Sequence, residues 1–463
     1  MKKIVLMTLS ILMVMTAFAQ ENKRKTITLT DTERSLVGQN NTFAFNLFRQ
    51  TRDTESQVIS PLSVTYALAM LNNGAEGITR EEICQVLSGG QQTRYADVPT
   101  MNAFCLKMLK ESALLDEDTR VSIANTIYFN GDRKDISLKS AFLQAAETYY
   151  DATPDVLSFG DEATVDIINE WASDHTDGMI PNLLKPEDMQ NPNLVSLLLN
   201  AICFKGAWVS PFNAEYTQKQ DFDNGRRTAM MMHQTEEFAY AENDLYQSVI
   251  LPYGNGAYQM TFFLPLSEKT LDDVLASMNG QNWNASKYQR RQVALSIPRI
   301  ETDTTQDMKD IMASLGMKNS FLDYNGHGFL DFCYIGDNEE DSDPCWISMI
   351  RQKAHLKLDE KGTEAAAVTV IAVADKAVFE IAEFNANRPF LYIISERSTG
   401  SIFFIGQYMG EATKGTTQIE DLKQIEGNPD IYDLQGRRVD SSSPSTLKKG
   451  LYIIGGKKVL VNQ

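Results

Sequence analysis

The chain has 463 residues, enough for about three average domains or for one large compact domain. Its hydrophobic fraction of 43% and charged fraction of 22% are those of a chain that buries a core, which excludes wholesale disorder and a fibrous repeat. The formal net charge of −18 repels phosphate backbones, so we expect no nucleic-acid partner and no binding to heparin-like polymers or anionic membranes.

The first residues have the pattern of an export signal. Lys2 and Lys3 precede an unbroken apolar run, and residues 17–19 (Ala-Phe-Ala) provide the small side chains that flank a cleavable bond. We expect residues 1–19 to be a signal peptide cleaved after Ala19, which makes the chain secreted: extracellular, on the outer cell surface, or periplasmic. The alternative is an uncleaved membrane anchor, for which the apolar run is short.

Export also permits a disulfide, although the five cysteines leave at least one thiol unpaired. Cys333 and Cys345 flank the acidic loop 336–343 (GDNEEDSD), and we expect these two to pair. The loop lacks the alternating ligands and the following glutamate of an EF-hand, so we expect a solvated acidic loop and no metal site.

Between residues 35 and 410 the predicted elements are mixed, without a repeat or a strict β-α-β alternation. The spacing of apolar residues predicts a helix over Asn41–Arg49 and a buried helix from Ser60 to Leu71, ended by residues 72–74 (Asn-Asn-Gly). The apolar runs 195–204 and 259–264 have the length of strands inside large sheets. Early helices and later strands of long sequence separation predict an α+β fold.

The end of the chain differs from this body. Residues 411–428 are polar and without periodicity, as in a linker, and residues 429–463 contain short strand-like runs with a hairpin around Gly455. The sequence IYDLQGRRV followed by KKGLYIIGGKKVLV resembles the end of the C-terminal sorting domains that some Gram-negative bacteria use for type IX secretion. The alternative is an ordinary small β appendage.

The chemistry of an enzyme is missing from the sequence. The four histidines form no HExxH motif and no pair at metal-ligand spacing. There is no GxSxG turn, no glycine-rich phosphate loop after a strand, and no CxxC. We therefore expect neither turnover of a substrate nor a cofactor.

Four segments in chain order resemble the serpins, a family of serine protease inhibitors. They are residues 60–83 (SPLSVTYALAMLNNGAEGITREEI), 198–212 (LLNAICFKGAWVSPF), 358–369 (LDEKGTEAAAVT) and 384–394 (FNANRPFLYII). The resemblance covers about 375 residues. It implies the serpin fold: a large mixed sheet with further sheets, surrounding helices and an exposed reactive loop.

The segment 360–376 (EKGTEAAAVTVIAVADK) has the pattern of a strand that can enter a sheet. After Gly362 it contains no glycine and no proline, and strong strand formers follow the alanines. Alternation puts Thr363, Ala365 and Ala367 on one face, where small side chains permit burial. By itself this pattern also fits a permanent central strand. The resemblance implies instead a bait loop that inserts into the main sheet after cleavage, with a hinge of Glu360, Gly362, Thr363, Glu364, Ala365, Ala366 and Ala367.

In the family the attacked bond follows the sixteenth residue after the hinge glutamate, which here is Lys376, followed by Ala377. A lysine at this position favours a trypsin-like target, whose specificity pocket presents a carboxylate. The alternative is attack near Val373 and Ala374, which favours elastase-like or subtilisin-like proteases.

The resemblance also implies a polar cluster below the point where the sheet opens, formed by Ser60, Asn200 and Gln352, with Trp208 near the hinge entry. The family usually has histidine where Gln352 stands. Because glutamine does not titrate near neutrality, we expect no pH control of opening through that side chain.

We therefore predict an exported bacterial serpin, monomeric, that inhibits a serine protease irreversibly through a covalent complex formed at Lys376–Ala377. The small side chains of the hinge favour an inhibitor. The alternative function is a non-inhibitory binding or scaffold protein of the same fold at the cell surface.

Overall fold

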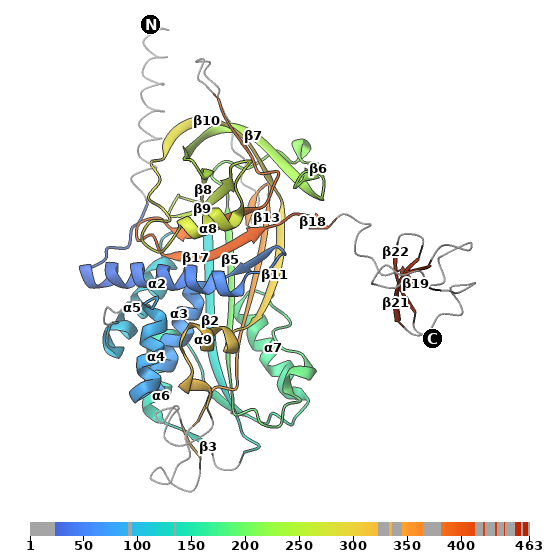
Figure 1. Cartoon of the computed structure of the whole chain (residues 1–463). Coiled ribbons are helices and arrows are strands. Elements are labelled where there is room, and N and C mark those ends of the chain that lie inside the picture. The colour runs from blue at the N-terminus through green and yellow to red at the C-terminus, as the bar shows by residue number, and fades with distance from the viewer. Residues whose placement is uncertain are drawn as a thin grey trace. The chain divides into compact units, whose positions relative to one another are not determined.

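Figure 1 shows the computed structural model, which describes residues 24–90, 95–133, 136–322, 333–335, 345–363, 381–412, 420–421, 431–432, 439, 450–454 and 457–461. The chain divides into two compact units, one of Met1–Gln218 with Met231–Met409 and the other of Lys219–Met230 with Gly410–Gln463. The second unit thus takes Lys219–Met230 from the segment 35–410 that the sequence assigns to the body. The predicted linker and appendage boundaries stay predictions.

The first unit contains the helices of the described chain. They are α2 (Asp31–Thr51), α3 (Pro61–Leu71), α4 (Gly77–Leu87), α5 (Val98–Ser112), α6 (Ser140–Tyr150), α7 (Ala163–His175), α8 (Leu271–Ser277) and α9 (Lys309–Leu315). Short 3-10 turns are η1 (Asn72–Gly74), η2 (Pro186–Met189), η3 (Ala214–Tyr216) and η4 (Asn319–Phe321).

The predicted start of the first of these helices is wrong, because α2 begins at Asp31 and not at Asn41. Thr30 and Glu33 form a capping box: the Thr30 hydroxyl accepts from the Glu33 amide at 3.2 Å, and the Glu33 carboxylate accepts from the Thr30 amide at 2.7 Å. A start at Asn41 overlooks this cap.

The second predicted helix is confirmed as α3. The Ser60 hydroxyl accepts from the Ser63 amide at 3.3 Å, Pro61 takes the first turn, and the helix passes into η1 at Asn72. Every residue of α3 is buried, since the helix contacts β17 on one side and β2 and β5 on the other. It therefore lies in the core between the two sheets of this unit.

The larger sheet has the strand order β1-β17-β16-β9-β8-β7-β10-β15. Its strands are β1 (Gln57–Ile59), β7 (Arg227–Glu242), β8 (Tyr246–Tyr253), β9 (Tyr258–Pro265), β10 (Gln289–Pro298), β15 (Ala382–Asn385), β16 (Phe390–Glu396) and β17 (Ile402–Tyr408). β9 contains the predicted strand 259–264, and β16 and β17 are buried along their whole length.

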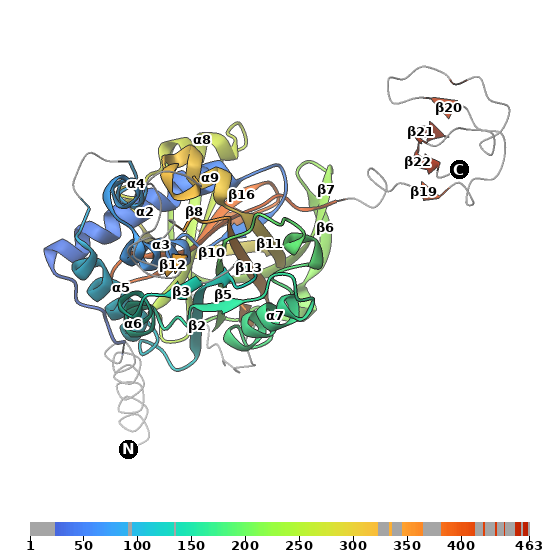
Figure 2. The same cartoon turned by 90° about the horizontal axis from the view of Figure 1, so that it is seen from below.

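The second sheet has six strands in the order β11-β13-β14-β5-β2-β4, and we call it the six-stranded sheet. Its strands are β2 (Thr119–Asn130), β4 (Asp155–Leu157), β5 (Ser196–Ala207), β11 (Ile300–Asp307), β13 (Met349–Asp359) and β14 (Gly362–Thr363). β5 contains most of the predicted strand 195–204. Figure 2 shows α7 against this sheet beside β2 and β5. Helices together with these sheets confirm the predicted α+β class.

The remaining strands are short. A pair is formed by β12 (Cys333–Ile335) and β3 (Ile136–Leu138). In the second unit, β18 (Glu411–Ala412) pairs with the start of β7, next to β6 (Gln218–Phe222). A small sheet contains β19 (Glu420–Asp421), β22 (Lys457–Val461), β21 (Gly450–Ile454) and β20 (Ile431–Tyr432). Within it β21 and β22 pair antiparallel, as the hairpin pattern predicts.

Cys345 takes part in a disulfide, and Cys84, Cys105 and Cys203 are free thiols. The side chain of Cys333 lies outside the described residues, so the Cys333–Cys345 pair stays a prediction. The segment 1–19 also lies outside them. In the described part of the chain, no helix has both the length and the apolar character needed to cross a bilayer.

Candidate functional site

The strand β14 begins a new ladder at one end of the six-stranded sheet. The chain turns after β13, and β14 runs back antiparallel to it, with Thr363 opposite Leu358. On its other side β14 pairs antiparallel with β5, with Thr363 opposite Gly206. Residues 360–363, which we call the hinge turn, thus enter the sheet between β13 and β5.

An ion pair fixes the start of the hinge turn. The Arg299 guanidinium donates to the Glu360 carboxylate at 2.6, 2.9 and 3.1 Å, and the Thr217 hydroxyl donates to the same group. The Glu360 carbonyl accepts from the Phe212 amide at 2.8 Å. Partial burial works to raise the pKa of Glu360, but the hydrogen bonds from Arg299 and Thr217 outweigh it and keep that pKa below the ordinary value.

Thr363 is completely buried inside the sheet. Its hydroxyl lies 2.8 Å from the hydroxyl of Tyr253, a residue of β8 in the other sheet that is also fully buried. Burial raises the pKa of Tyr253, so its hydroxyl keeps its proton. The hydrogen bond satisfies both buried groups, and Thr363 is therefore held on the inner face of the sheet.

Trp208 and Gly362 pack where the hinge turn meets the end of β5. The Trp208 ring stacks on Tyr253 with centroids 4.3 Å apart, and its indole N–H donates to the Asp359 carbonyl at 3.1 Å. Gly362 has φ +141°, and a Cβ there would lie 2.1 Å from the carbonyl oxygen of Gly206. Glycine is thus required where the backbones of the hinge turn and β5 come close.

The structure brings Ser60, Asn200 and Gln352 together in the closed part of the sheet. The Gln352 side-chain N–H2 donates to the Ser60 carbonyl at 2.9 Å and to the Asn200 side-chain oxygen at 2.7 Å. The Gln352 side-chain oxygen accepts from the Ser60 amide at 3.2 Å. Asn200 also donates to Asn125 at 2.6 Å and to the hydroxyl of Ser63. These groups are at most 2% exposed and satisfy one another.

Further from the hinge turn, toward Met349 of β13, the strands β13 and β5 pair directly with each other. The pairing is parallel and runs from Ala354 opposite Ile202 to Met349 opposite Leu197, with Gln352 opposite Asn200. Gln352 and Asn200 therefore lie on the same two strands, β13 and β5, that β14 separates at the hinge end.

The rest of the predicted loop lies outside the described residues. This holds for the hinge positions Glu364, Ala365, Ala366 and Ala367 and for the predicted cleavage pair Lys376–Ala377. The alternative pair Val373–Ala374 lies outside them as well. One difference from the sequence analysis is visible at the start: Gly362 and Thr363 are already in the sheet, because the Tyr253 hydroxyl and two strand edges are available to them.

Sequence reasoning missed several partners of these residues. Asn125 lies in an apolar run of strand length (IANTIYF, residues 123–129), just as Asn200 does in its own run. A polar side chain inside such a run needs a buried hydrogen-bond partner, and this pattern could have indicated that Asn125 belongs to the cluster. Arg299, Thr217 and Tyr253 have no such signal, because each reaches the hinge turn from a distant segment of the chain.

Comparison with known proteins gives a consistent result. The family model described as Serpin (serine protease inhibitor) matches residues 38–410. Neuroserpin from Homo sapiens is 28% identical over 391 residues, covering 81% of this chain and 90% of its own length. The crystal structure of the thermophilic serpin Tengpin in the native state superposes with a TM-score of 0.72 at 26% identity, covering 83% of this chain and 96% of that one.

Thyroxine-binding globulin in complex with thyroxine has a TM-score of 0.68 at 24% identity, covering 80% of this chain and 98% of its own. This likeness concerns the fold. In that other protein, the same fold binds a small molecule.

Proposed function

The chain belongs to the serpin family, and we propose that it inhibits a serine protease irreversibly by inserting its loop into the six-stranded sheet. The observation that carries this proposal is the continuity of two registers. β14 lies opposite both β13 and β5, and those two strands go on to pair directly with each other.

A loop that continued the register of β14 would run between existing partners. Ala367 would come between Ala354 and Ile202, and Thr369 between Gln352 and Asn200, which are themselves paired in the closed sheet. Opening therefore requires β13 and β5 to move apart sideways, with no slip of one along the other. A change without slip keeps every side chain on its own face.

The energy for such a change comes from the new strand. Its backbone exchanges one interstrand ladder for two, and each added hydrogen bond contributes about 1 kcal/mol net. The inner face adds burial of small and branched side chains at about 25 cal/mol per Å². Loop insertion with release of stored strain is general to inhibitory serpins, so only the register is specific to this chain.

We propose Lys376–Ala377 as the bond that the protease attacks, and a trypsin-like enzyme as the target. The proposed product is a covalent complex of one protease with one monomer. The signal-like start and the C-terminal segment 429–463 support secretion, with type IX export as the proposed route.

The test is a denaturing gel after mixing the chain with trypsin, followed by mass spectrometry of the cleaved loop. An SDS-stable complex with cleavage after Lys376 is the expected result. Complete cleavage without a complex contradicts inhibition and favours the non-inhibitory binding protein. The variant Lys376→Ala should stop trapping of trypsin and leave the urea unfolding midpoint unchanged. Trapping at an unchanged rate would place the attacked bond elsewhere, with Val373–Ala374 as the next candidate.

A further inference from the structure

A cavity of about 560 Å³ lies between α4 and the segment that leads into α5, and we call it the α4–α5 cavity. One wall is the face of α4 that carries Arg80, Cys84 and Ser88, which are spaced four residues apart and so lie on the same side of the helix. The other wall is formed by residues 95–99. The volume is in the range of small-molecule sites in proteins.

The wall on the α5 side is mainly apolar. The ring of Tyr95, the side chain of Val98 and the ring of Pro99 line it. The Tyr95 hydroxyl donates to the Asn40 side-chain oxygen at 2.8 Å, so this polar group already has its partner in the core. A cavity of this size and character favours a ligand with an apolar body.

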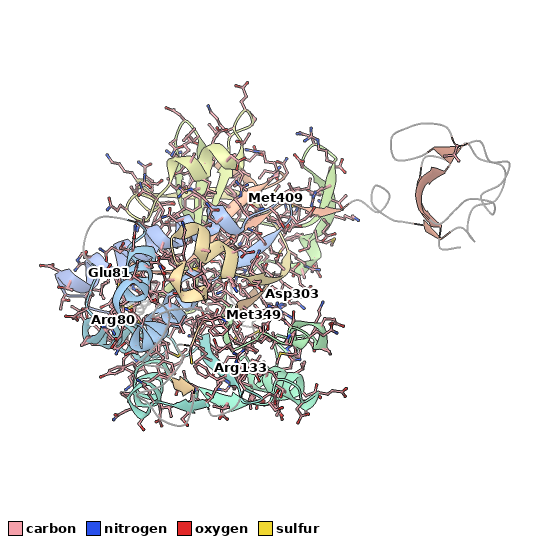
Figure 3. All side chains as sticks on the ribbon, turned by 60° about the horizontal axis from the view of Figure 1, so that its bottom comes forward. Arg80, Glu81, Arg133, Asp303, Met349 and Met409 are labelled. Carbon is pink, nitrogen blue, oxygen red and sulfur yellow. The ribbon has the colours of Figure 1, made fainter. Side chains whose placement is uncertain are left out.

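Arg80 brings a cationic donor to the wall on the α4 side, and Figure 3 labels it beside its neighbour Glu81. The Arg80 Nε is buried, and in the described part of the chain no acceptor contacts it. Buried N–H groups nearly always have an acceptor, because leaving one without a partner costs free energy. The planar guanidinium matches the geometry of a carboxylate, so a bound acid would provide the missing acceptor.

Two carboxylates limit which acid fits. Glu81 and Asp97 are exposed and line the cavity, and the Asp97 carboxylate caps α5 by accepting from the Thr100 amide at 2.9 Å. They would repel a second negative group on the ligand, so the ligand has one carboxylate and a neutral remainder. At about 30 Å³ for each non-hydrogen atom, the cavity holds fewer than about 19 such atoms. A fatty acid of about ten carbons fits within this limit.

We propose that the α4–α5 cavity binds a small amphipathic monocarboxylic acid, with the carboxylate at Arg80 and the apolar chain against Tyr95, Val98 and Pro99. None of the described residues that line the cavity belongs to the hinge turn or to the polar cluster of Ser60, Asn200 and Gln352. The proposed acid site therefore goes beyond the proposed inhibition and does not depend on it.

Cys84 provides a reporter for the site. Its thiol is half-buried on the cavity wall and accepts from the Asn72 side-chain N–H2 at 3.4 Å. The other free thiols of the described chain, Cys105 and Cys203, are 0% and 1% exposed. Burial raises the pKa of Cys84, although the nearby Arg80 charge acts in the opposite direction, so we expect slow alkylation that is selective for this thiol. A ligand in the cavity would cover it.

The test measures the rate at which iodoacetamide alkylates Cys84 in the full-length protein, followed by mass spectrometry, with decanoate or decanol as the probe. At about pH 8.5, we expect about 1 mM decanoate to slow the alkylation at least threefold and the same concentration of decanol to slow it less than about 1.5-fold, because decanol has no charge for Arg80 to bind. Calorimetric titration with decanoate measures the affinity directly, whether or not Cys84 reacts.

Arg80→Gln should weaken the affinity for decanoate about tenfold, since it removes a charge-assisted hydrogen bond. Glu81→Gln, at the next position, is the matched control and should bind decanoate as tightly as the unaltered chain or more tightly. Urea midpoints establish that both variants are folded. If Arg80→Gln fails to fold, the comparison of decanoate with decanol in the unaltered chain still tests the proposal.

Three results would each overturn the acid site: no heat and no protection with decanoate, equal effects of decanoate and decanol, or an unchanged affinity in folded Arg80→Gln. The trypsin gel involves none of these residues. A chain that traps trypsin and does not bind decanoate keeps its proposed function and loses the acid site. A chain that binds decanoate through Arg80 and traps no protease keeps the acid site and loses the inhibitor role.

Discussion

The two ends of the junction between β5 and β13 differ in what separates the strands. At the hinge end β14 lies between them, and Thr363 is buried and bonded to Tyr253. At the other end the strands are in direct contact, and buried amides of Gln352 and Asn200 join them. The same two strands thus hold β14 between them at the hinge end and pair directly with each other at the other end.

The comparison predicts where a bulky charge stops insertion. Thr363 is already buried, so a charge there would disturb the starting structure itself. Ala365 is a cleaner position, since the register of β14 would bring it between Leu356 and Phe204 on the inner face. We expect Ala365→Arg to be cleaved by trypsin and to trap less than about one hundredth as much of it, because burying an unpaired guanidinium costs several kcal/mol.

Glu364→Arg is the matched control, because the same register would put position 364 on the outer face beside Lys357 and Lys205, which are partly exposed. The control should still trap trypsin. Denaturing gels of both variants at equal protease concentration measure the difference. Equal trapping by Ala365→Arg and Glu364→Arg would contradict insertion in this register.

The closed end can be weakened at Gln352. Gln352→Leu removes three hydrogen bonds and leaves the Ser60 amide and carbonyl and the Asn200 oxygen without that partner. We expect the free energy of unfolding to fall by about 2–4 kcal/mol, because these groups are buried. Urea unfolding followed by tryptophan fluorescence gives the value. Gln289→Leu, at an exposed position on β10, should change it by less than about 0.5 kcal/mol. A similar value for both variants would show that the cluster does not stabilise the closed end.

At the hinge end, we expect the free energy of unfolding to depend less on any one side chain than it does at the closed end. Glu360→Gln removes the charge that Arg299 and Thr217 contact, and the Arg299 side chain is 42% exposed. Solvent therefore compensates part of the loss, and we expect unfolding to become easier by about 1–2 kcal/mol. Glu301→Gln, in the exposed pair with Lys357, is the control and should change little. An effect of Glu360→Gln as large as that of Gln352→Leu would mean that the two ends are equally dependent on their polar bonds.

Much of this junction could be predicted from the sequence, and the exceptions have physical reasons. The apolar run of β5 with Asn200 inside it, the cap at Ser60 and the alternating hinge residues are local patterns, and the first two correspond to elements of the structure. The capping box at Thr30 was also local, but it lies among polar residues that hide the start of α2.

What could not be predicted depends on the tertiary structure. Arg299 reaches Glu360 from the segment between β10 and β11, and Tyr253 reaches Thr363 from the other sheet. Arg351 of β13 donates to Asp188, which lies far away in the chain between α7 and β5. A single sequence contains no periodicity that pairs such residues. Whether Thr363 lies inside the sheet depends on the free energy gained by strand pairing against the conformational entropy lost by the loop. The residue pattern does not determine which of the two is larger.

The smallest expected effect is the pH dependence of the hinge end. The pKa of Glu360 in the folded protein lies below that of an ordinary glutamate, so its contribution to stability is complete above the ordinary pKa and is lost as the pH falls through the folded-state pKa. Protonation then removes the charge that Arg299 contacts, and Glu360→Gln has already removed it. The stability difference between the unaltered chain and Glu360→Gln should therefore be constant from pH 8 to about pH 5.5 and shrink below the ordinary glutamate pKa of about 4.3. Urea midpoints of both proteins across this range measure it, and a difference that grew with acid would show that Arg299 does not hold the ionised form of Glu360.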